Sequence, residues 1–304
     1  MRRHSIFLSL LILTFIVLTA EAGDLVRIVR LKLSAGDLAS GAAAAEEYKK
    51  KSGVDAEYLD AVGWLARGAQ MLNQPDAAAA YVAELRREIR EEKPDLIIPF
   101  GAAIEVEGKL RAAREGRGSA LRFLEEEFAR AKDTALRSRI RKNINLLSLE
   151  GQPAPELNSA NFAGPEPARL AALKGKPVLL FLWAHWCGDC KAQAATLSRV
   201  LEKYRGQGLV MIAPTRLYGT GAGDKPATPA EEKAHVEKVW KELYPGLEGV
   251  SIPIDTETMV RYGVSATPTF VLINRNGVVR LYTPTRLSEA ELSQRIEAVL
   301  AETH

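Results

Sequence analysis

Two patterns of apolar positions divide the chain. In the C-terminal half, short apolar or β-branched runs predict buried strands at 178–183, 209–213, 269–273 and 278–282. Segments with helical spacing separate these runs, and this alternation predicts an α/β arrangement. Asn276-Gly277 lies between the last two runs and predicts a hairpin turn. Capping-box patterns that begin at Thr228 and Ser288 each predict the start of a helix.

The N-terminal half has helical spacing from residue 24 to about 148, with little strand-like alternation. One apolar stripe consists of Tyr58, Val62, Leu65 and Ala69. Breaks at Gly, Asn-Gln-Pro and Lys-Pro sequences predict short turns and antiparallel helix pairs. Residues 58–87 loosely resemble a tetratricopeptide-type helix pair. A plain helical bundle fits equally well, and a repeat array would offer a concave face to a protein partner.

The chain is expected to comprise three parts, with boundaries at 1–22, 23–150 and 151–304. A positive start, an apolar stretch over 6–18 and the small-x-small sequence Ala20-Glu21-Ala22 predict that the first part is a signal peptide. An uncleaved membrane anchor is the alternative. Either way, the protein is expected to be exported, in the periplasm or at the outer face of the cytoplasmic membrane. Gly151-Gln152-Pro153-Ala154-Pro155 is a linker by composition.

Composition changes this picture little. The net charge is only +3 and the charge signs are interleaved, so no nucleic-acid partner is indicated. The hydrophobic content of 47% and charged content of 26% are those of an ordinary globular protein.

The candidate chemistry lies in Cys187 and Cys190, the only two cysteines of the chain. They follow the predicted strand 178–183 at the start of a predicted helix, where free amides and the helix dipole favour a thiolate. A thiolate with a second thiol nearby can attack a disulfide and then resolve the mixed disulfide. A metal site would need further ligands. The chain has no other cysteines and its four histidines are scattered, so no metal is expected. A purely structural disulfide over so short a loop would stabilise little.

Residues 151–304 resemble the thioredoxin-like superfamily, and within it the TlpA/ResA-type extracytoplasmic thiol-disulfide oxidoreductases. The resemblance is collinear over the following segments: 173–177, Trp183–Cys190, Asp255, 262–264, Ala266–Phe270 and Asn276-Gly277. An insertion at about 214–250 also falls where TlpA-type proteins carry extra sequence. The resemblance implies an α/β thioredoxin-like fold, a central mixed sheet flanked by helices, preceded here by an all-α helical domain.

The resemblance also implies a site. Cys187 would be the nucleophile and Cys190 the resolving thiol. Thr267-Pro268 would have a cis peptide bond and form, with Trp186, the surface on which a substrate strand docks. No bound cofactor is implied. The partners would be disulfides of exported proteins, with electrons supplied by a membrane thiol donor.

This chain departs from its relatives in its proton acceptors. Phe181 stands where thioredoxins have a buried acid, and Gln193 stands where many ResA-type proteins have Glu. Asp189 is therefore the first candidate for proton transfer, ahead of water or a carboxylate brought in by the fold. The Asp189 carboxylate disfavours a neighbouring thiolate, which predicts a reductant. His185 is expected at the surface and would oppose this effect if protonated.

Three functions remain open from the sequence. The first is an exported thiol-disulfide oxidoreductase that acts as a reductant. The second is an adaptor whose helical half binds a partner, with a merely structural thioredoxin-like half. The third is a thiol peroxidase, although Cys187 lacks the Thr/Cys/Arg surroundings of those enzymes.

Overall fold

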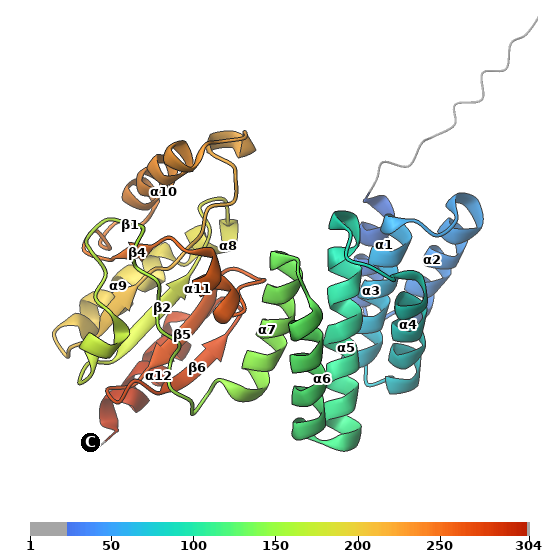
Figure 1. Cartoon of the computed structure of the whole chain (residues 1–304), viewed down its shortest axis with the longest axis horizontal. Helices are drawn as coiled ribbons and strands as arrows, with labels where there is room; N and C mark the ends of the chain where they lie inside the picture. The colour runs from blue at the N-terminus through green and yellow to red at the C-terminus, as the bar shows by residue number, and fades with distance from the viewer. Residues whose placement is uncertain (1–22, 303–304) are drawn as a thin grey trace, which may run out of the picture.

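The computed structural model describes residues 23–302 (Figure 1). The predicted signal peptide, 1–22, lies outside this range. The N-terminal half is entirely helical, as predicted, with helices α1 (Asp24–Ser34), α2 (Leu38–Ser52), α3 (Ala56–Met71), α4 (Pro75–Glu88), α5 (Ile97–Glu115), α6 (Arg117–Arg130) and α7 (Thr134–Ser148). None of the helices within 23–302 is long and apolar enough to cross a membrane.

Consecutive helices of this half pack against each other. The apolar stripe of α3 is buried as its spacing predicts, from Tyr58 to Ala69. Glycines with positive φ follow two of the helices, Gly53 after α2 and Gly116 after α5. A residue without Cβ adopts this conformation at little cost, which explains why the helices end there.

The C-terminal half is a mixed α/β unit, also as predicted. Its strands are β1 (Phe162–Ala163), β2 (Val178–Leu182), β3 (Val210–Ile212), β4 (Ile252–Pro253), β5 (Thr269–Ile273) and β6 (Val279–Thr283). Its helices are α8 (Gly188–Ala192), α9 (Ala194–Arg205), α10 (Pro229–Leu243), α11 (Thr256–Arg261) and α12 (Glu289–Ala301). The main sheet has the order β3-β2-β5-β6, in which β2 is parallel to β3 and the other pairs are antiparallel.

The central strand β2 is buried on both faces, which explains its unbroken apolar sequence. Because side chains alternate along a strand, Leu179 and Phe181 enter one core with residues of α9, α10 and α12. Leu180 and Leu182 enter a second core on the opposite face, with Met259 of α11. The hairpin predicted at Asn276-Gly277 joins β5 to β6.

The two halves are joined by a close contact of α7 with the end of α11 and the segment that follows it. The Nδ2 amide of Asn145, on α7, donates a hydrogen bond to the carbonyl oxygen of Arg261 over 3.1 Å. Leu149, just after α7, is buried in the second core of the sheet. In Figure 1, α7 lies between the rest of the helical half and the sheet. The last helix of one half therefore forms part of the support of the other.

Candidate active site

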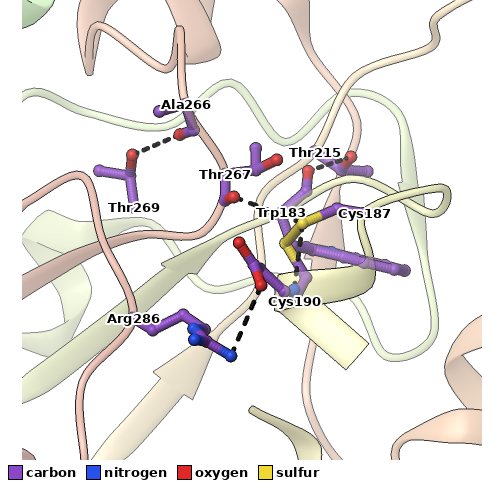
Figure 2. The surroundings of a disulfide bond; sticks show 9 residues. Trp183, Cys187, Cys190, Thr215, Ala266, Thr267, Thr269 and Arg286 are labelled. Atoms are coloured by element: carbon purple, nitrogen blue, oxygen red, sulfur yellow. Dashed lines mark hydrogen bonds and ion pairs between the residues drawn. A yellow bond between two sulfur atoms is a disulfide. The ribbon is translucent and has the colours of Figure 1, made fainter. Parts of the chain in front are cut away.

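Cys187 and Cys190 lie at the end of the segment that leaves β2, where α8 begins. They form a disulfide with a Cα–Cα distance of 5.3 Å (Figure 2). Cys187 caps α8, and the backbone N–H of Cys190 donates to its Sγ over 3.0 Å. Cys187 is 4% exposed and Cys190 is fully buried. Of the two sulfur atoms, that of Cys187 is therefore the one that an incoming disulfide can reach.

The Thr267-Pro268 segment lies directly beside this disulfide. Its peptide bond is cis, as the resemblance implies. The Thr267 carbonyl oxygen lies 3.4 Å from the Sγ of Cys187 (Figure 2). The sheet register explains this proximity: Leu182 pairs with Thr269 in antiparallel β2 and β5, so the segment after β2 and the segment before β5 meet at one end of the sheet.

The backbone before the cysteines is fixed by two buried hydrogen bonds. The Thr215 hydroxyl donates to the Trp183 carbonyl over 2.8 Å, and the Trp183 indole N–H donates to the Ala213 carbonyl over 3.1 Å. The Trp183 ring also packs against Trp240 of α10, with ring centroids 5.0 Å apart. The insertion that carries α10 thereby holds the segment that presents the cysteines.

Trp186 lies at the surface beside Cys187, where a docking residue is expected. Its side chain is 48% exposed although it is large and apolar. Its ring meets the ring of Tyr218 edge to face, with centroids 5.3 Å apart. The site thus offers an exposed aromatic surface next to the reachable sulfur atom.

Asp189 points into solvent and is not close-packed against the cysteines. Its side chain is 65% exposed, and its Oδ1 lies 3.5 Å from Nη1 of Arg286. The guanidinium partly neutralises the carboxylate, which reduces the influence of Asp189 on a Cys187 thiolate. A role for Asp189 in proton transfer stays a prediction.

The expectation of a surface His185 is wrong. Its side chain is only 1% exposed, and Nε2 lies 3.0 Å from Oε1 of the equally buried Glu232. Burial lowers the pKa of His185, and the opposing effect of the Glu232 hydrogen bond does not reverse that shift. The imidazole is therefore neutral at neutral pH. The sequence did not reveal this because Glu232 lies 47 positions further along the chain, on α10.

Glu232 is the site residue that the sequence interpretation missed. Besides contacting His185, its carboxylate accepts hydrogen bonds from the backbone N–H groups of Tyr218, over 2.6 Å, and Gly219, over 2.7 Å. The sequence held one sign that Glu232 is buried: it lies one helical turn before Val236, on the apolar face of α10. Glu232 is a carboxylate brought in by the fold, and it joins α10 to the cysteine segment through His185.

The two positions that lack the relatives' acids are filled by structural residues. Phe181 is fully buried in the core. The Gln193 side chain is also buried, and its Oε1 accepts a hydrogen bond from the Leu287 N–H over 3.0 Å. Within residues 23–302, no group of three or more His, Cys, Asp or Glu side chains is arranged to hold a metal ion.

Comparison with known proteins addresses the C-terminal half. The Redoxin family model matches residues 149–294. The C-terminal half is a thioredoxin-like domain. It is related to the thiol-disulfide oxidoreductase ResA of Geobacillus thermodenitrificans, with 26% identity over 153 residues, which cover 49% of this chain and 77% of that protein. The thiol:disulfide interchange protein DsbE of Pseudomonas aeruginosa is 31% identical over 137 residues, 44% of this chain and 65% of DsbE.

A solved structure, a putative thiol:disulfide interchange protein DsbE from Chlorobium tepidum, has 25% identity and a TM-score of 0.40. The match covers 50% of this chain and 98% of that one. The thioredoxin-like domain thus has homologues among the thiol-disulfide oxidoreductases and carries the C-x-x-C pair of such enzymes at disulfide distance. The matches leave the helical half unassigned.

Proposed function

We propose that the protein is an exported thiol-disulfide oxidoreductase that reduces disulfides of other exported proteins. One observation carries the proposal: a reachable Cys187 sulfur atom lies against both the buried Cys190 and the Thr267 carbonyl. The homology of the domain to ResA and DsbE supports the same chemistry. The signal peptide predicted at 1–22 supports export.

The reaction begins with the reduced enzyme. The Cys187 thiolate attacks one sulfur of the substrate disulfide, forms a mixed disulfide and releases the other substrate sulfur as a thiolate, which takes up a proton. Cys190 then loses its proton and attacks the Cys187 Sγ. The second substrate thiol leaves, and the Cys187–Cys190 disulfide forms. Two electrons have passed from the enzyme to the substrate, and a membrane thiol donor would restore the dithiol.

The surroundings of the cysteines support a reductant. A thiolate that is strongly stabilised in the reduced enzyme makes the couple oxidising. Here the nearest imidazole, His185, is buried and neutral, so it adds no positive charge. The Cys187 sulfur accepts a hydrogen bond from the Cys190 N–H and lies at the N-terminus of the short helix α8. Together these give only moderate stabilisation of a thiolate.

The reduction potential of the Cys187–Cys190 couple tests this proposal. Residues 23–304 would be equilibrated in thiol buffers of known potential. We expect a value nearer to about −270 mV, as in thioredoxin, than to about −120 mV, as in a strong disulfide oxidant. A value near the oxidising limit would contradict the direction of the reaction. A chain that forms no Cys187–Cys190 disulfide would contradict the enzyme itself and favour the adaptor.

Single cysteine variants separate the two thiol roles. Cys190→Ser should accumulate a mixed disulfide with substrate proteins, because the resolving thiol is gone. Cys187→Ser is the matched control and should trap far less, since Cys190 is fully buried. Non-reducing gel electrophoresis measures both. Equal trapping by the two variants would contradict the assignment of Cys187 as the nucleophile.

A further inference from the structure

A cavity of about 380 Å³ lies where the helical half meets the redox site. The helical half contributes α7, through Ala135, Ser138 and Arg139. The thioredoxin-like domain contributes Trp186, Arg216, Tyr218 and residues 264–267. Of these, Trp186 and Thr267 also lie beside Cys187. We call this cavity the α7 cleft. It is continuous with the place where a substrate disulfide must approach.

Arg139 brings an incompletely satisfied positive charge to the cleft. Its Nε is buried and has no hydrogen-bond partner among the described residues. Its side chain lies over Gly101 of α5, so closely that a Cβ at Gly101 would come within 2.7 Å of the Arg139 Cδ. Asp60 and Glu105 attract the guanidinium from the helical half, but burial is the larger effect and lowers its pKa.

The nearby Glu105 is already engaged by other cations. It forms ion pairs with Lys109 over 2.9 Å, with Lys142 over 3.2 Å and with Arg67 over 3.4 Å. Its charge is therefore shared among several positive groups rather than reserved for Arg139. The guanidinium of Arg139 retains capacity for one more acceptor.

Arg216 provides a second guanidinium, from the thioredoxin-like domain. It lies over the ring of Tyr218, 4.6 Å from the ring centroid, and Tyr218 in turn contacts Trp186. Within residues 23–302, neither Arg139 nor Arg216 has a carboxylate oxygen within 4.0 Å. The residues that line the cleft include these two arginines and no Asp or Glu.

We propose that the α7 cleft binds an acidic peptide segment that flanks the substrate disulfide, with Arg139 and Arg216 pairing with its carboxylates. The inference rests on the proposed function for its substrate. A guanidinium recognises a carboxylate through two parallel N–H···O bonds, and partial burial strengthens such pairs. Because the cleft is lined by Trp186 and Thr267, which also lie beside Cys187, a chain whose sulfur reaches Cys187 can extend into the cleft. Arg139 of the helical half and Arg216 of the thioredoxin-like domain would together select the substrate by charge.

The test compares two short synthetic peptides that lack cysteine, one with two glutamates and one with glutamines in their place. Binding to the oxidised chain, residues 23–304, is measured by fluorescence anisotropy of labelled peptide. We expect the acidic peptide to bind about tenfold more tightly, as for a partly buried charge pair. The difference should shrink as ionic strength rises. Equal binding of the two peptides would overturn the proposal.

Three variants locate the site. Arg139→Gln and Arg216→Gln should each remove most of the preference for the acidic peptide. Arg137→Gln is the matched control, because Arg137 lies on the same helix but packs over the Phe128 ring, 4.9 Å from its centroid, outside the cleft. Circular dichroism checks that each variant folds. If Arg139→Gln does not fold, Arg216→Gln decides, since Arg216 comes from a loop. A preference that survives in Arg216→Gln would overturn the proposal.

Two reduction assays separate this inference from the proposed function. The reduced enzyme is given bis(2-hydroxyethyl) disulfide, which is uncharged, and two further peptides, acidic and amide versions of the same sequence in which an added cysteine carries a disulfide. If the uncharged disulfide is not reduced, the proposed function fails, while the binding assay still judges the cleft. If it is reduced but the acidic and amide peptides react at equal rates and bind equally, only the cleft proposal fails.

Discussion

Two titratable side chains close to the cysteines in sequence have polar partners that offset their charge. His185 is buried as a neutral ring against Glu232, and Asp189 is paired with Arg286 in solvent. Two further positive groups, Arg139 and Arg216, line the α7 cleft. The groups that could shift the pKa of the thiols are therefore different from the groups proposed to bind the substrate.

The buried His185 should make the stability of the protein dependent on pH. Its pKa is lowered in the folded chain from an ordinary value of 6.5. As pH falls below that value, the unfolded chain binds a proton that the folded chain does not, so folding loses free energy. The slope is at most about 1.4 kcal/mol per pH unit for one proton. Above the ordinary pKa, this contribution is constant.

Urea unfolding of wild type and His185→Gln above and below pH 6.5 measures this effect. The difference in unfolding free energy between the two proteins should change in favour of the variant as pH falls. His235→Gln, which removes a histidine whose ring lies 5.0 Å from that of His185, is the control. The same pH dependence in wild type and His185→Gln would contradict the prediction.

At the level of elements, local signals predicted most of the thioredoxin-like domain. Strand β5 was predicted at its observed bounds, and both capping boxes begin helices, α10 after Thr228 and α12 after Ser288. These features depend on neighbouring residues and were therefore visible in the sequence. Strands β1 and β4 were missed, because each has only two residues and gains its structure from pairing with the other.

Features that need distant partners were not predictable in the same way. The burial of His185 depends on Glu232, which α10 brings to it. The α7 cleft depends on how α7 packs against the segment after α11. No local pattern in the sequence encodes the relative placement of the two halves.

Gly263 makes the contact between α7 and the segment after α11 possible, and its replacement should be costly. It has φ +63°, and a Cβ there would lie 2.6 Å from the Lys142 Cα and 2.8 Å from the Arg141 carbonyl carbon. Gly263→Ala adds a backbone collision to the left-handed strain, so we expect a loss of about 3 kcal/mol or more in unfolding free energy.

Gly277→Ala is the matched control for this substitution. Gly277 also has a positive φ, +79°, but nothing lies within 4 Å of its would-be Cβ. Gly277→Ala should lower the free energy of unfolding only through the left-handed strain, by about 1 kcal/mol. Denaturant unfolding of both variants measures the difference. Equal losses would show that α7 does not approach Gly263 as closely as described.

At the scale of the whole molecule, the two halves share structure rather than merely touch. Leu149, which follows α7, is buried in a core of the sheet. The Tyr282 N–H of β6 donates to the Glu150 carboxylate over 3.0 Å. The end of the helical half is therefore part of the folded thioredoxin-like domain.

This sharing predicts a single unfolding transition. Far-UV circular dichroism reports mainly on the helices, whereas tryptophan fluorescence reports mainly on the thioredoxin-like domain, which holds Trp183, Trp186 and Trp240 and leaves only Trp64 elsewhere. The two probes should give coincident midpoints in urea. Two separated transitions would show that the halves unfold independently.

The contact at Gly263 also restricts how such a protein can arise or be re-engineered by recombining its parts. Gly263 lies in the thioredoxin-like domain, four positions before Thr267, yet the backbone it accommodates belongs to the helical half. A donor domain with a side chain at this position could not be joined to this helical half in the same orientation. The two parts therefore behave as a matched pair rather than as interchangeable modules.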